Sequence, residues 1–147
     1  MLKKLSIGSF ISVFAAVVIL VGFILGIVTN AVQGYPVNAF AGFVVAEIGA
    51  ILLIGGSIFL SFRRGNKLAC YLPLFVATVC AGIGFALVIA SRTELVGTLW
   101  VTALDSTNPL AVKAMNTGTV SFVCNIVAML LLVVSGFFPL AKEDKAE

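Results

Sequence analysis

Four long stretches of the chain are almost free of charge, and they constrain the fold more than any other feature. They cover residues 7–28, 39–62, 68–90 and 117–140, and Glu47 is the one charged residue within them. A helix needs about 20 apolar residues to cross a hydrocarbon core of about 30 Å. Membrane-spanning strands alternate over about ten residues, whereas these runs are continuous and about twice as long. We therefore predict an all-α integral membrane protein with four transmembrane helices in a single domain.

The composition excludes several other classes of protein. Charged residues make up 10% of the chain, hydrophobic residues 61%, and the mean hydropathy is +1.22. A soluble domain carries roughly a quarter charged residues, which it needs to cover its surface in water. This excludes a cytosolic enzyme, a disordered chain and a secreted disulfide scaffold, and we expect the lipid bilayer rather than nucleic acid as a partner.

The cations are distributed unevenly around the predicted spans. Of the nine Lys and Arg residues, seven would lie on one side of the membrane: Lys3, Lys4, Arg63, Arg64, Lys67, Lys142 and Lys145. Arg92 and Lys113 fall in connections on the other side. Because cytoplasmic loops carry such an excess of cations, we expect both termini in the cytoplasm, with residues 141–147 as a cytoplasmic tail. A bacterial plasma membrane is the expected location.

The first apolar stretch has an alternative interpretation as a signal peptide. Lys3 and Lys4 form a charged start, as in such peptides. The apolar run is about 22 residues long, however, against the 7–15 residues of a signal core. The pattern therefore favours a membrane span.

The second and fourth spans resemble each other, which indicates two tandem helical hairpins. Residues 44–53 align with residues 122–131 with five identities, and the alignment places Glu47 over Asn125. The first and third spans align more loosely through Gly22 and Gly84. Apolar spans also come to resemble each other in a shared lipid environment, so duplication and coincidence are both open from the sequence.

Residues 91–116 form the longest connection, on the predicted outer side. Asn108 followed by Pro109 is typical of a helix N-cap and first helical residue, so the fourth helix would begin before its membrane span. Trp100 favours the membrane interface because its ring is apolar and its N–H is polar. The loop is therefore either a short interfacial segment or an ordinary connection with one anchoring Trp.

The residues that most enzymes and metal sites require are missing from the sequence. The chain has no His, and its three cysteines, Cys70, Cys80 and Cys124, have no C-x-x-C spacing. No phosphate-binding or nucleophile-elbow motif occurs. We therefore expect no catalytic activity, no metal and no cofactor.

Glu47 is the principal candidate for a functional residue. A carboxylate near the middle of a membrane costs about 2.5–3.5 kcal/mol to insert, and such residues mark ion or substrate pathways or paired contacts. A stripe of small residues, formed by Gly42, Ala46, Gly49 and Gly56, lies roughly 140° around the same helix. We expect this stripe to pack against a neighbouring helix of the chain. Glu47 would then face a second interface or a water-filled cavity, and a hydrogen bond within the monomer is the alternative.

Four further residues in the spans are candidates for contacts between helices. Asn125 is expected to form an interhelical hydrogen bond along a packing seam. Thr78 either joins Asn125 and Glu47 in a polar cluster or bonds to its own backbone. Gly22 and Gly26 form a G-x-x-x-G pattern, which indicates either a seam within the chain or a homodimer face.

The sequence supports two hypotheses of function. In the first, the chain is an oligomeric transporter or channel component in which Glu47 lines or gates the path. In the second, it is an accessory or assembly subunit that docks on a larger membrane complex, with Glu47 at the interface.

Overall fold

The computed structural model describes residues 6–63, 67–96 and 108–140. These residues form four helices, which are α1 (Ile7–Asn30), α2 (Phe40–Arg63), α3 (Lys67–Val96) and α4 (Pro109–Gly136). All four are long and apolar enough to cross a membrane. The described part of the chain contains no strand. The prediction of an all-helical protein is therefore confirmed for the described residues, and the four helices have the length and apolar composition that membrane spans require.

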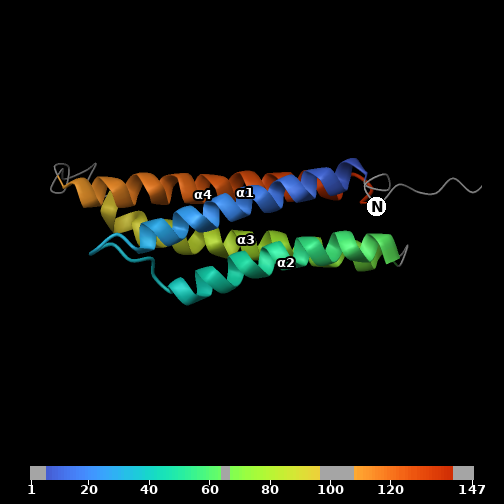
Figure 1. The fold of residues 1–147 in the computed structure, drawn as a ribbon, viewed down its shortest axis with the longest axis horizontal. Coiled ribbons are helices and arrows are strands. Elements are labelled where there is room, and N and C mark those ends of the chain that lie inside the picture. Colours follow the sequence, from blue (N-terminus) through green and yellow to red (C-terminus); the bar gives the residue numbers. More distant parts are fainter. Residues whose placement is uncertain (1–5, 64–66, 97–107, 141–147) are drawn as a thin grey trace, which may run out of the picture.

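The helices form an elongated bundle (Figure 1). α1 lies along α4, α2 lies along α3, and α3 also packs against α4, whereas the contact between α1 and α2 is less extensive. The start of α1 and the end of α4 lie at one end of the bundle, together with the end of α2 and the start of α3. We call this the basic end, after Arg63 and Lys67 at the adjoining ends of α2 and α3. The opposite end is called the Arg92 end.

Two helix boundaries differ from those expected from the sequence. α3 continues to Val96, so part of the predicted 91–116 loop is helical, and no Pro or Gly interrupts the chain between Ala90 and Gly97. α4 ends at Gly136 instead of residue 140, because Pro139 lacks the N–H that a continuing helix requires and restricts the residue before it.

The start of α4 lies where the sequence indicates. The Asn108 side chain accepts a hydrogen bond of 3.0 Å from the backbone N–H of Leu110, and Pro109 occupies the first turn. This cap satisfies one of the free N–H groups at the helix start. Trp100, the predicted interfacial anchor, lies outside the described residues.

A buried apolar cluster joins all four helices in the half of the bundle nearer the basic end. We call it the apolar layer, and it consists of Ala15, Ile19, Ala50, Ile54, Leu74, Ala77, Ala81, Ala128 and Leu132. Many larger apolar side chains point outward instead, and Leu52 and Phe75 are each 69% exposed. An outer surface of this kind is suited to lipid, since a soluble monomer rarely exposes large contiguous apolar patches.

Candidate functional site

Glu47 of α2 and Asn125 of α4 meet in the interior of the bundle. The Asn125 Nδ2 atom donates a hydrogen bond of 2.8 Å to Glu47 Oε1. Both residues are 0% exposed. Of the two alternatives for Glu47, the structure has the hydrogen bond within the monomer and not a second interface or a water-filled cavity.

Each member of this pair lies against a glycine of a neighbouring helix. A Cβ atom on Gly84 of α3 would overlap the Glu47 carboxyl, and a Cβ atom on Gly22 of α1 would lie 3.5 Å from Asn125 Oδ1. The two glycines therefore provide the space in which the pair forms. We call Gly22, Glu47, Gly84 and Asn125 the polar layer, to which each helix contributes one residue.

Two oxygen atoms of the polar layer have no hydrogen-bond partner among the described residues. These are Glu47 Oε2 and Asn125 Oδ1, both of which are buried. A buried polar atom without a partner costs about 1–3 kcal/mol. Because both atoms are acceptors, they lack a hydrogen donor or a cation, and a proton bound to the carboxyl would supply one donor.

Arg92 forms a second buried polar site, nearer the end of the bundle that carries its name. Its side chain is 2% exposed. The Nη2 atom donates to the backbone oxygens of Thr29 and Tyr35, at 3.3 and 2.9 Å, and to Thr29 Oγ1 at 3.3 Å. The Nε atom is buried without a partner among the described residues, and a Cβ atom on Gly118 of α4 would lie 3.0 Å from it. The guanidinium is therefore held by neutral oxygens.

Arg92 does not pair with Glu47. It lies eight residues beyond Gly84 along α3, a rise of about 12 Å. Because the predicted loop begins at residue 91, the length of the third span alone does not identify Arg92 as a buried site. The absence of Pro and Gly from residues 91–96 is the available signal that α3 continues past it.

Hydroxyl groups connect the two polar sites along the seam between α1 and α4. Thr117 Oγ1 donates to Thr29 Oγ1 at 2.8 Å, and Ser121 Oγ donates to the backbone oxygen of Gly22 at 2.7 Å. Thr117, Ser121 and Asn125 are spaced four residues apart, so they share one face of α4. Polar contacts therefore extend from the Arg92 end to the polar layer and stop at the apolar layer.

The other predicted polar residue lies elsewhere. Thr78 Oγ1 donates to the backbone oxygen of Leu74, one turn earlier in the same helix, at 3.0 Å. It belongs to the half of the bundle that holds the apolar layer. Thr78 is therefore not part of the polar layer.

The predicted packing glycines divide into two groups. Gly22 lies against α4, and a Cβ atom on Gly26 would overlap the ring of Phe43, so both are contact positions within the chain. Gly42 is exposed, and a Cβ atom there would lie 3.6 Å from Leu87 of α3, whereas a Cβ atom on Gly49 or Gly56 would have no other atom within 4 Å.

Gly49 and Gly56 are half-buried, so the small-residue stripe of α2 is turned partly outward, in contrast to the prediction. Ala46 is its one buried small residue, at 7% exposure. The physical reason is that apolar residues are about equally stable against lipid and inside the bundle. Burial of the polar pair therefore determines how α2 is rotated.

The described residues contain no group of three His, Cys, Asp or Glu side chains that would hold a metal ion. Comparisons with protein-family models, with curated proteins and with solved structures found no match for this chain. Glu47 can exchange a proton, and Asn125 can act as either donor or acceptor toward it.

Proposed function

We propose that this chain is a non-enzymatic component of a small oligomeric membrane transporter, in which Glu47 gates the path by binding and releasing a proton. The observation that carries the proposal is the buried Glu47–Asn125 pair, with one oxygen atom of each residue left without a described partner. An ionisable residue at membrane depth marks by default a substrate pathway or a proton relay.

Binding of a proton changes the hydrogen bond that the pair makes. An ionised carboxylate only accepts, so it faces the Asn125 amide N–H. A neutral carboxyl can also donate, and the Asn125 amide oxygen, which has no other partner among the described residues, is available to accept. Because Glu47 lies on Gly84 and Asn125 on Gly22, the exchange of one arrangement for the other involves surfaces of all four helices.

The path that Glu47 gates is proposed to lie between copies of the chain. The apolar layer fills the bundle between the polar layer and the basic end, so it closes a route through a single bundle. Gating of a path between bundles requires only that the polar layer alters how the helices pack. Such coupling is expected where two discrete packings differ by a few kcal/mol.

We further propose that both termini are cytoplasmic, in a bacterial plasma membrane, and that the two hairpins are tandem repeats. Seven of the nine cations support this orientation. The repeat is supported by the glycine contacts, since Glu47 lies on Gly84 and Asn125 on Gly22. These are the positions that the sequence alignment pairs.

The transport proposal is tested in liposomes that contain a pH-sensitive dye. The reconstituted protein should dissipate an imposed pH gradient faster than empty liposomes do. Glu47→Gln should reduce this rate to that of empty liposomes, because the amide cannot bind and release a proton. Thr78→Val is the control and should leave the rate unchanged, since the Thr78 hydroxyl bonds only within its own helix.

Equal rates for Glu47→Gln and the wild type would remove Glu47 from the mechanism. A wild-type protein that leaves the pH gradient intact would contradict proton-coupled gating altogether.

A second candidate function is that of an accessory subunit, which the outward face of α2 favours. Gly49 and Gly56 have open space where a side chain would be, and small residues let helix backbones approach closely. If a partner helix docks there, Gly49→Leu and Gly56→Leu should prevent a larger membrane protein from co-purifying with the chain. Gly55→Leu, on another face of α2, should not. Unchanged co-purification in all three variants would contradict docking at this face.

A further inference from the structure

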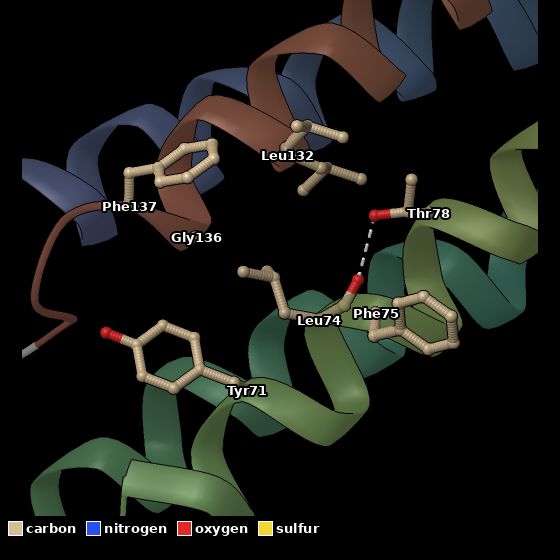
Figure 2. A pocket seen from close by; sticks show the side chains of 8 residues that line it. Tyr71, Leu74, Phe75, Thr78, Leu132, Gly136 and Phe137 are labelled. Atoms are coloured by element: carbon tan, nitrogen blue, oxygen red, sulfur yellow. Dashed lines mark hydrogen bonds between the residues drawn. The ribbon is translucent and has the colours of Figure 1, made fainter.

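The outer surface of the bundle contains a pocket between α3 and α4, close to the basic end. It has a volume of about 390 Å³ and is lined by Tyr71, Leu74, Phe75, Thr78, Leu132, Val133, Gly136 and Phe137. Figure 2 shows Tyr71 and Phe137 on opposite sides of one end of the pocket, with Leu74 between them and Thr78 deeper along α3. Pockets of about 300–1,000 Å³ hold small ligands in proteins.

The lining of the pocket is suited to an apolar occupant. Its two hydroxyl groups already donate to backbone oxygens, Thr78 to Leu74 at 3.0 Å and Tyr71 to Phe138 at 3.0 Å. The remaining lining side chains carry no polar atom. The lining therefore offers a ligand no free hydrogen donor, and a ligand oxygen placed inside this pocket would lose its hydrogen bonds to water without replacement.

The pocket extends along the membrane normal from the bundle end inward. Tyr71 and Thr78 are seven residues apart on α3, a rise of about 10 Å. Tyrosine is enriched at the level of lipid headgroups, where its ring is apolar and its hydroxyl is polar. Tyr71 therefore marks the headgroup end of the pocket, and Thr78 marks the acyl-chain end.

Positive charge is concentrated at the headgroup end. α2 ends at Arg63 and α3 begins at Lys67, one turn before Tyr71. The predicted cytoplasmic segments together hold seven Lys and Arg residues against three acidic residues, Glu143, Asp144 and Glu147, so their net charge is positive. Basic residues next to a membrane helix attract anionic headgroups.

We propose that this pocket is a binding site for an anionic phospholipid. One acyl chain occupies the pocket between α3 and α4, and the phosphate lies at the basic end, where α2 ends and α3 begins. The site is independent of Glu47 and of the proposed transport, because it lies on the lipid-facing side of the apolar layer.

Native mass spectrometry of the full chain released from bilayer nanodiscs tests the site. With equal phosphatidylglycerol and phosphatidylcholine, the wild type should retain one phosphatidylglycerol molecule per chain. Gly136→Phe should abolish this retention, since a side chain at Gly136 enters open space without a clash and fills the pocket. Gly55→Phe is the matched control, because Gly55 also has no atom within 4 Å and lies on α2.

Charge variants test the headgroup separately. Arg63→Gln and Lys67→Gln should each lower the preference for phosphatidylglycerol over phosphatidylcholine by about fivefold, while one lipid remains bound. Lys113→Gln, near the Arg92 end, should leave the preference unchanged.

Retention of lipid by Gly136→Phe would overturn the proposed pocket, and Val133→Trp provides a second pocket-filling variant at a 52% exposed position if the first fails to fold. Equal retention of the two lipids by the wild type would contradict the proposed preference for an anionic headgroup.

Discussion

Replacement of Asn125 by leucine is expected to lower the free energy of unfolding by about 2–4 kcal/mol. The change removes a hydrogen bond worth about 0.6–2 kcal/mol in a membrane. It also leaves the Glu47 carboxyl buried without its partner, which costs about 1–3 kcal/mol more. Leucine has the same four side-chain heavy atoms and the same branch point as asparagine, so the change opens no cavity, although its methyl groups are larger than the amide atoms. Unfolding in mixed micelles of mild detergent and dodecyl sulfate, followed by circular dichroism, provides the measurement.

A double-mutant cycle measures the interaction energy between Glu47 and Asn125 apart from the contacts that each makes with other residues. Glu47→Leu combined with Asn125→Leu should be less destabilising than the sum of the single changes, because no polar group is then left without a partner. The expected coupling is about 0.5–3 kcal/mol. Val123→Leu, at a position 45% exposed on the same helix, is the control and should have little effect. Strict additivity would mean that the hydrogen bond does not contribute to stability.

Two glycine-to-alanine changes are expected to have effects of opposite sign. Gly26→Ala places a methyl group where the Phe43 ring lies, and Phe43 is 0% exposed. The ring cannot move away freely, so we expect a loss of about 1–3 kcal/mol. Gly49→Ala meets no atom within 4 Å and should gain up to about 1 kcal/mol, since alanine is the better helix former.

The same unfolding assay compares these two variants. If both changes were neutral, the close contact between α1 and Phe43 would not persist in the folded protein. If Gly49→Ala were strongly destabilising in the oligomer alone, a partner helix would lie against the outward face of α2.

The number and approximate extent of the helices follow from the sequence because membrane thickness imposes a length on each apolar run. The N-cap at Asn108 follows from the local chemistry of Asn before Pro. The ends of α3 and α4 are less well determined by the sequence, since beyond the membrane surface a helix continues until a residue stops it. Pro139 provides that signal after α4, whereas α3 continues past Ala90 as far as Val96.

The inward face of α2 could not be predicted in the same way. In water, apolar residues select the core-facing side, but in lipid they are stable on either side. The small-residue rule points to Gly49 and Gly56, while the structure turns Phe43, Glu47 and Ile54 inward. A rule based on burying the single carboxyl would have given the correct face, because that residue carries the largest cost of exposure to lipid.

The sequence contains a signal for the partner of Glu47. It contains no signal that Gly22 and Gly84 would provide the space for the pair. The repeat alignment places Asn125 at the position of Glu47, and both side chains then lie at one depth. The role of Gly84 depends on how α2 and α3 are rotated against each other, which is a property of tertiary packing.

The apolar layer also makes the two ends of the bundle electrically unequal. In an energised membrane, the voltage falls mainly across regions of low polarizability, and a charge that crosses the whole field changes in energy by about 2.3 kcal/mol per 100 mV. Between Glu47 and the Arg92 end, the hydroxyl dipoles of Thr117 and Ser121 reduce the share of the membrane voltage that drops over this region. Exchange of a proton between Glu47 and the Arg92 end is therefore expected to depend only weakly on voltage.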